Sequence, residues 1–284
     1  MVRFGSEELE FEVVEDWDQL PEGWKYHHII GIDVDKDDNV YIFNRGDHPV
    51  IVFNRDGIFQ KSWGEGFFNS PHGIYIDHQD NVFLTDSNHH AVFKFTLDGE
   101  LLETYGTKGE LHEGEPFNRP TDVAVAPTGE IYVSDGYVNS RVHKFSPDGK
   151  LQLSWGEPGD GPGQFEIPHD VDIHKDGRVF IADRQNNRIQ IFDPFGNYLE
   201  EWTGFQLPCA VYIGRDERIY VPELRSRLSI LDMEGNLLVR WGGEKSDESR
   251  MFRAPHCTTL DSQGDLYIGE SLDGSRIQKY KRIR

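Results

Sequence analysis

His169–Ile181 reads H-D-V-D-I-H-K-D-G-R-V-F-I, and this stretch decides the fold. Two short runs in which apolar and polar residues alternate flank the polar turn Lys175–Gly177. Alternation with a period of two is typical of strands joined in a hairpin, not of a helix. The same pattern occurs six times along the 284-residue chain, which indicates an internal repeat. The copies begin at Gly31, His72, Thr121, His169, Cys209 and His256.

The spacing of the copies indicates a β-propeller. Five of the six copies directly follow a proline. These prolines are at positions 71, 120, 168, 208 and 255, and the intervals between them are 49, 48, 40 and 47 residues. Propeller blades repeat at intervals of about 40 to 50 residues. Each repeat also continues into a third apolar run, such as 141–145, and a fourth that ends near a Trp-Gly pair, such as Trp155-Gly156. Four strands make one blade, so we expect an all-β, six-bladed β-propeller.

The last repeat is one strand short. It ends after its third strand, at Tyr280 and Lys281, whereas the N-terminal run at 9–14 (L-E-F-E-V-V) has no partner within its own repeat. We expect this run to complete the last blade, because closure removes the exposed edges of an open array. The sequence therefore predicts a single domain over residues 1–284.

Composition and charge exclude several classes of function. The chain has 50 acidic and 29 basic residues and a formal charge of -21, which opposes binding to nucleic acid or to anionic membranes. It contains no apolar run near the roughly 20 residues that span a bilayer, and its first residues lack the apolar core of a signal peptide. With only two cysteines, Cys209 and Cys257, which we expect to be buried thiols, a cytoplasmic location is expected.

Three histidines occupy one position in alternate repeats. The residues that open the first strand are Ile30, His72, Thr121, His169, Cys209 and His256. First strands of a propeller line its central channel, so alternate blades point at the axis from directions about 120° apart. Three imidazoles in that arrangement can share one ion at about 2.0 to 2.1 Å and leave a coordination position open, as in catalytic zinc sites. The alternative is that each is an ordinary hydrogen-bonded core histidine, but the alternate spacing favours zinc or another first-row divalent metal.

A second position, at the end of each second strand, is acidic in five repeats. Its members are Arg45, Asp86, Asp135, Asp183, Glu223 and Glu270. We expect the acids to hold neighbouring loops. Arg45 departs from the pattern, and such departures in a repeat protein mark functional positions.

Several motifs together resemble a known enzyme family. They are Y-I-F-N-R-G-D-H (41–48), P-H-G-I-Y-I-D (71–77), P-T-D-V-A-V (120–125), V-S-D-G-Y-V-N-S-R (133–141), G-Q-F-E-I-P-H (163–169), A-D-R-Q-N-N-R-I-Q (182–190) and A-P-H (254–256). From about Gly31 to the last blade, the chain resembles the peptidyl-α-hydroxyglycine α-amidating lyases, which are built from NHL-type repeats. The resemblance implies a six-bladed propeller and a zinc-dependent lyase.

The resemblance also implies the roles of particular residues. The zinc ligands of the family match His72, His169 and His256; its catalytic arginine and tyrosine match Arg45 and Tyr137; and a substrate-binding arginine matches Arg184. The family's second, calcium-type site uses two carbonyls, matched by Ile32 and Ile74, and an aspartate that is Cys257 here. Because thiols are poor calcium ligands, calcium binding is doubtful.

These residue types suit the cleavage of a carbinolamide, which collapses to an amide and an aldehyde such as glyoxylate. Zinc would bind the substrate hydroxyl and promote loss of its proton. Tyr137 would accept that proton, Arg45 would favour the phenolate, and Arg184 would bind a carboxylate. The substrate would be a small-molecule or peptide carbinolamide.

Two other functions remain open. One is a non-catalytic NHL propeller that binds a protein or peptide partner. The other is a lactonase-like hydrolase, although calcium-dependent lactonases use carboxylate and amide ligands where this chain offers imidazoles.

Overall fold

A computed structural model describes residues 3–6, 8–243, 251–272 and 275–284, and its strands form six antiparallel sheets of four or five strands. These sheets are the blades of a six-bladed β-propeller, as the repeat predicts. A short parallel pair, β15 (Glu157–Pro158) and β16 (Gln164–Phe165), stands apart from the blades. Nowhere in the described part of the chain is there a helix long and apolar enough to cross a membrane.

The blades divide between two compact units. Residues 67–211 form one unit, and residues 1–66 with 212–284 form the other. The prediction of a single domain over residues 1–284 stays a prediction.

The unit of residues 67–211 contains three blades. The first is β7 (Pro71–Ile76), β8 (Asn81–Asp86), β9 (Ala91–Thr96) and β10 (Leu101–Tyr105). The second is β11 (Asp122–Val125), β12 (Ile131–Asp135), β13 (Arg141–Phe145) and β14 (Leu151–Trp155). The third is β17 (Pro168–Ile173), β18 (Val179–Asp183), β19 (Arg188–Phe192) and β20 (Tyr198–Thr203). Each blade is a meander in which consecutive strands pair.

The other unit also contains three blades. The first is β3 (Ile29–Val34), β4 (Val40–Asn44), β5 (Val50–Phe53) and β6 (Phe59–Trp63). The second is β21 (Tyr212–Ile213), β22 (Ile219–Glu223), β23 (Arg227–Leu231) and β24 (Leu237–Gly242). The third is β25 (Pro255–Leu260), β26 (Leu266–Glu270), β27 (Arg276–Arg282), β2 (Glu10–Val14) and β1 (Arg3–Gly5). The inner strand β21 is shorter than the repeat predicts, because it begins at Tyr212 and not near Cys209.

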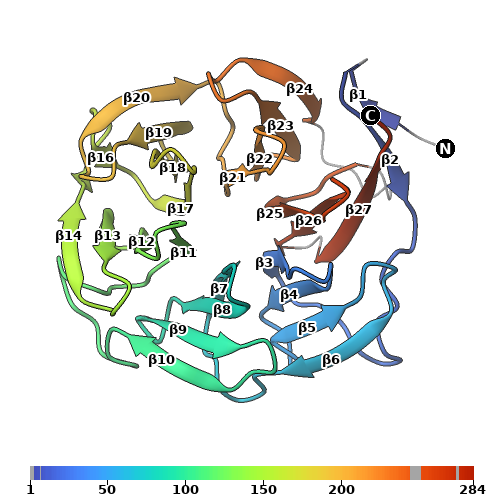
Figure 1. Ribbon diagram of the computed structural model, residues 1–284, viewed down its shortest axis with the longest axis horizontal. Helices are drawn as coiled ribbons and strands as arrows, with labels where there is room; N and C mark the ends of the chain where they lie inside the picture. Colours follow the sequence, from blue (N-terminus) through green and yellow to red (C-terminus); the bar gives the residue numbers. More distant parts are fainter. Residues whose placement is uncertain (1–2, 7, 244–250, 273–274) are drawn as a thin grey trace. The chain divides into compact units, whose positions relative to one another are not determined.

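The N-terminal strand completes the last blade, as predicted. β2 pairs antiparallel with β27, with Phe11 opposite Arg282 and Val14 opposite Lys279, and Figure 1 shows the two strands side by side. Phe11 is fully buried and its ring packs against Trp241. β1 adds a fifth strand outside β2, which the sequence reasoning did not predict.

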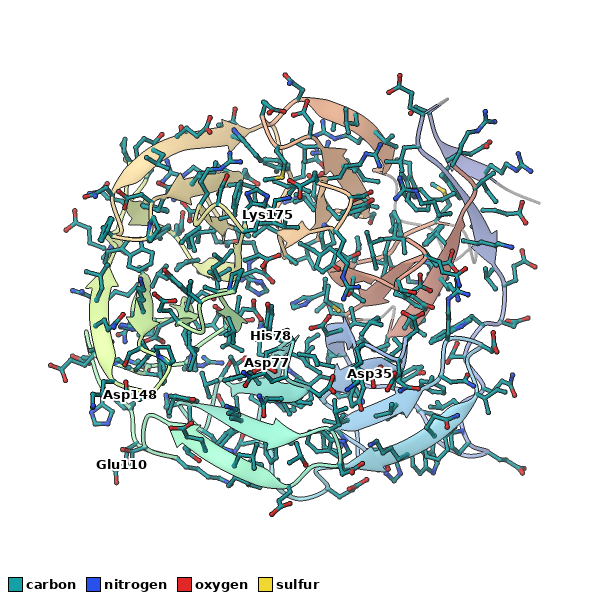
Figure 2. The ribbon with its side chains drawn as sticks, viewed as in Figure 1. Asp35, Asp77, His78, Glu110, Asp148 and Lys175 are labelled. Atoms are coloured by element: carbon teal, nitrogen blue, oxygen red, sulfur yellow. The ribbon has the colours of Figure 1, made fainter. Side chains whose placement is uncertain are left out.

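The turn between the first two strands is held by an aspartate side chain in the blades that begin with β3 and β7. After β7, Asp77 Oδ1 accepts hydrogen bonds from the backbone N–H groups of Gln79 and Asn81, at 2.8 and 2.9 Å. Asp35 accepts in the same way after β3. Aspartate favours turns because its side chain satisfies the turn backbone. Figure 2 labels Asp77 and His78 on the first of these turns and Lys175 on the corresponding turn after β17.

Apolar residues from adjacent blades form the core. Between the first two blades of the 67–211 unit, Phe83, Phe117, Val123 and Phe145 are all buried in one cluster. Burial stabilises by roughly 25 cal/mol per Å² of apolar surface, so packing between blades holds the inner strands in place. These inner strands position the histidines.

Candidate functional site

His72 is the second residue of β7 and lies at an irregularity in the sheet. The register of β7 against β8 shifts between Pro71 and Ile74, and such a bulge re-aims the side chain that it contains. The ring is buried, and its Nδ1 lies 2.6 Å from the carbonyl oxygen of Thr121. Because a carbonyl only accepts, Nδ1 must donate, which leaves the lone pair on Nε2.

His169 repeats this arrangement in β17. The register shifts between Pro168 and Asp170, the ring is buried, and Nδ1 lies 2.7 Å from the carbonyl oxygen of Cys209. The rings of His72 and His169 are 4.7 Å apart between centroids, at an interplanar angle of 74°. The sequence prediction that these two residues converge is therefore confirmed within this unit.

Tyr137 brings a hydroxyl group to both imidazoles. Its oxygen lies 2.9 Å from His72 Nε2 and 3.4 Å from His169 Nε2. Gly136 makes this approach possible, since a Cβ there would lie 1.8 Å from the carbonyl oxygen of Pro168. The loop after β12 can thus run close against β17, with the phenol directed at the histidines.

The donors in this unit fit a divalent metal. Two imidazole lone pairs meet at one hydroxyl group, whose single proton can be donated to only one of them. Imidazole nitrogen suits zinc and other first-row divalent ions, and a donated N–H to a backbone carbonyl fixes the tautomer of a metal-binding histidine. His72 and His169 meet both requirements.

His256 has the same local geometry in the other unit. It is the second residue of β25, at a shift in register between Pro255 and Cys257. It is buried, and its Nδ1 lies 3.0 Å from the carbonyl oxygen of Ile30. In all three cases, the carbonyl belongs to the residue at the equivalent position of another repeat. His256 is therefore prepared to present Nε2 as His72 and His169 do.

Arg184 and Arg119 both lie against the ring of Tyr137. Their guanidinium carbons are 5.7 and 5.2 Å from the ring centroid, respectively. The substrate-binding role of Arg184 that the resemblance implies stays a prediction. Sequence reasoning missed Arg119, although a signal was present: the residues before the other repeat prolines are uncharged, namely Ser70, Ile167, Leu207 and Ala254.

The predicted alignment of Arg45 with the acidic position is wrong. The register pairs Ile29 with Asn44 and Pro71 with Asp86, so Asn44 is the equivalent of the acid. The Asp86 carboxylate accepts the backbone N–H groups of Asn69 and Ser70, which is the loop-holding role expected of this position.

Arg45 falls one residue further along, at the position that Arg184 occupies in its own blade. The backbone N–H of Arg45 donates to the His27 carbonyl at 2.7 Å, as that of Arg184 donates to the Ile167 carbonyl at 3.1 Å. The predicted position was one residue too far along, because β4 ends at Asn44 and not at Arg45. The backbone hydrogen bonds show that Arg45 is equivalent to Arg184. The catalytic role of Arg45 stays a prediction.

Two acids next to this site, the buried Asp122 and the half-buried Asp170, were not predicted. Asp170 Oδ1 accepts from the Val211 N–H at 2.9 Å, and Asp122 Oδ2 from the Val171 N–H at 3.4 Å. Burial raises the pKa of Asp170 to about 8 and raises that of Asp122 well above its ordinary value. The sequence pattern gave no signal for this, since acids at alternating strand positions are ordinarily exposed.

The resemblance matches Cys257 to the aspartate of the family's calcium-type site. It is buried, and its thiol lies 3.8 Å from the carbonyl oxygen of Gly269, within its own sheet. Cys209 is also buried, and neither cysteine forms a disulfide within the described part of the chain. Both agree with the expectation of buried, reduced cysteines.

Comparisons with known proteins agree with this architecture. The NHL repeat family model matches residues 68–95, 117–145 and 165–192. NHL repeat-containing protein 3 of Mus musculus is 34% identical over 267 residues, which cover 85% of this chain and 75% of that protein. Among solved structures, a streptogramin B lyase has a TM-score of 0.65 at 16% identity over 95% of this chain and 87% of the other, which shows the shared fold.

The chain belongs to the NHL-repeat family of β-propellers. Within this family, it is similar to proteins named as amidating lyases. Peptidyl-alpha-hydroxyglycine alpha-amidating lyase 1 of Drosophila melanogaster is 40% identical over 148 residues, 48% of this chain and 27% of that protein. The probable peptidyl-alpha-hydroxyglycine alpha-amidating lyase of Caenorhabditis elegans is 29% identical over 188 residues, 59% of this chain and 50% of that protein.

Proposed function

We propose that this protein is a metal-dependent carbon-nitrogen lyase that cleaves an N-acyl carbinolamide of the α-hydroxyglycine type to an amide and glyoxylate or another aldehyde. The observation that supports it most directly is the Tyr137 hydroxyl between the Nε2 atoms of His72 and His169, at 2.9 and 3.4 Å. A proton-accepting group thus lies where two imidazole lone pairs converge. The similarity to proteins named as amidating lyases supports the same reaction class.

We propose further that His72, His169 and His256 together hold zinc or another first-row divalent ion. The support is their equivalence in the repeat: each is the second residue of an inner strand, lies at a bulge, and donates its Nδ1–H to the backbone carbonyl of the equivalent residue in another repeat. Alternate blades of a six-bladed propeller direct such residues toward a common axis. When bound, the metal would polarise the substrate hydroxyl and make its proton easier to remove.

The residues of the chain then account for the movement of protons. Tyr137, as its phenolate, accepts the hydroxyl proton, the O–H electron pair forms the carbonyl of the aldehyde, and the C–N bond breaks toward nitrogen. The amide nitrogen takes up a proton, which the Tyr137 hydroxyl can return, so that atoms and charge balance. General acid–base catalysis of this kind contributes about 10² to 10⁴ in rate.

Two arginines complete the proposal. Arg184, beside Tyr137, binds the carboxylate of an α-hydroxyglycine substrate, because the planar guanidinium fork matches a carboxylate. Arg45 is proposed to stabilise the phenolate of Tyr137 during the reaction. The substrate is a small molecule or a peptide.

The test is to incubate the purified protein with N-benzoyl-α-hydroxyglycine and to measure glyoxylate and bound metal. We expect one equivalent of metal in the wild type, and loss of metal and of most turnover in His169→Ala. His78→Ala is the matched control, because His78 is an exposed histidine of the same unit (Figure 2). Equal rates in the wild type and His169→Ala would reject the role of the metal. A metal-free protein without turnover would favour a non-catalytic NHL propeller that binds a partner.

A further inference from the structure

Two guanidinium groups lie against Tyr137 and have no acidic partner among the residues that the structure describes. Arg119 and Arg184 lie 5.2 and 5.7 Å from its ring centroid. Neither forms an ion pair with any residue that the structure describes, although the chain has 50 acidic residues against 29 basic ones. By contrast, Arg188 forms an ion pair with Asp183, and Arg227 forms one with Glu223.

Arg184 has a buried donor atom whose hydrogen bond is not satisfied by the described residues. Its Nε atom is buried and has no hydrogen-bond partner among the described residues. A buried donor that belongs to a charged group and lacks an acceptor is costly, typically by more than a neutral one. An anionic ligand at this position would supply the acceptor.

Arg119 is held at the same place by its backbone. Its N–H donates to His90 Nδ1 at 3.2 Å, and its carbonyl accepts the N–H of Tyr137 at 3.4 Å. The side chain is exposed, so the guanidinium is open to a ligand from solvent. Because both groups lie near one ring, the two guanidinium carbons are separated by no more than the sum of their distances to its centroid.

We propose that Arg119 and Arg184 form a binding site for a ligand with two carboxylates, one for each guanidinium. Applied to the proposed reaction, Arg184 binds the carboxylate of the α-hydroxyglycine end and Arg119 binds an acidic group in the acyl part. The substrate is therefore an acidic carbinolamide. The identity of the reactive end of the substrate rests on the proposed function, but the binding of two carboxylates by Arg119 and Arg184 does not.

The test uses ligands that cannot react. N-Succinylglycine carries two carboxylates, whereas N-butyrylglycine has an acyl chain of equal carbon number and only one, and neither has the hydroxyl that cleavage requires. Their dissociation constants are measured by calorimetry at low ionic strength with the wild type, Arg119→Gln and Arg184→Gln. Arg215→Gln is the matched control, since Arg215 is exposed and lies in the other unit.

We expect the wild type and Arg215→Gln to bind N-succinylglycine at least about tenfold more tightly than N-butyrylglycine, as a charge-assisted hydrogen-bond pair provides. Arg119→Gln should lose this preference and bind N-butyrylglycine as the wild type does, whereas Arg184→Gln should weaken both ligands. Equal binding of the two ligands by the wild type, or a preference that survives in Arg119→Gln, would overturn the proposal.

Turnover separates this proposal from the proposed function. If the α-hydroxyglycine forms of both ligands release no glyoxylate but the binding preference is present, the lyase reaction is refuted and the dicarboxylate site stands. If both are cleaved with equal kcat/KM and bound without preference, the lyase stands and the dicarboxylate site is refuted.

Discussion

Replacing Tyr137 with phenylalanine removes one oxygen atom and leaves the ring in place. That oxygen lies 2.9 Å from His72 Nε2 and 3.4 Å from His169 Nε2. The ring itself, which contacts Arg119 and Arg184, is unchanged. Tyr137→Phe therefore tests the hydroxyl alone.

The expected loss of activity is much larger than the loss of stability. Removal of a general base costs about 10² to 10⁴ in kcat, or about 3 to 5 kcal/mol of transition-state stabilisation. One hydrogen bond contributes about 0.5 to 1.5 kcal/mol to the free energy of unfolding, and the half-exposed position limits any further loss. KM should change little, because the groups proposed to bind the carboxylate remain.

The assay is steady-state release of glyoxylate, with bound metal measured in the same preparations and the free energy of unfolding measured in urea. Tyr198→Phe is the control, since Tyr198 is a half-buried tyrosine on β20 of the same unit. We expect it to keep full kcat. An unchanged kcat in Tyr137→Phe, with full metal content, would remove Tyr137 from the mechanism.

Three further predictions test the bound metal, the close approach of the loop at Gly136 and the titration of Asp18. Dialysis against a strong chelator should abolish turnover and lower the melting temperature, and added zinc should restore both, because a ligand of the folded state stabilises it by mass action; a fully active, metal-free protein would contradict this. Gly136→Ala should lower the free energy of unfolding, measured in urea, by about 1 to 3 kcal/mol, because the added Cβ would lie 1.8 Å from the Pro168 carbonyl oxygen. Gly161→Ala is the control and should cost less, because its Cβ would contact only the end of a flexible side chain. Equal losses in the two variants would refute the close approach. Burial raises the pKa of Asp18, which accepts a hydrogen bond from Tyr26 at 2.9 Å, so the folded state binds the proton more tightly and stability should fall as pH rises from the ordinary value of 3.8 through the raised one. Asp18→Asn should flatten this part of the stability profile, and an unaltered slope in urea titrations across that range would show that Asp18 does not titrate as inferred.

Much of the candidate site could be predicted because the repeat gives each residue a known place. His72, His169 and His256 share one position of the repeat, and each proved to be buried, at a bulge, with Nδ1 on a backbone carbonyl. The repeat also predicted that residues 9–14 would complete the last blade, since that blade was one strand short.

The errors lie where the chain departs from regular strands. Arg45 was aligned with the acids, but the hydrogen-bond register assigns that place to Asn44. Arg119 was not predicted because it lies in a loop, directly before Pro120. Its contact with Tyr137 depends on how the loop before β11 packs against the loop after β12.

The sequence by itself determined the all-β repeat, the number of blades and the alternation of the three histidines. These follow from periodicity, which local alternation and spacing record directly. Only the tertiary structure decided that the Tyr137 hydroxyl meets the two imidazoles, and that Arg119 and Arg184 flank its ring. Those contacts join residues that are tens of positions apart, through loops whose paths are set by packing and by close approaches such as Gly136 against Pro168, and no local pattern encodes them.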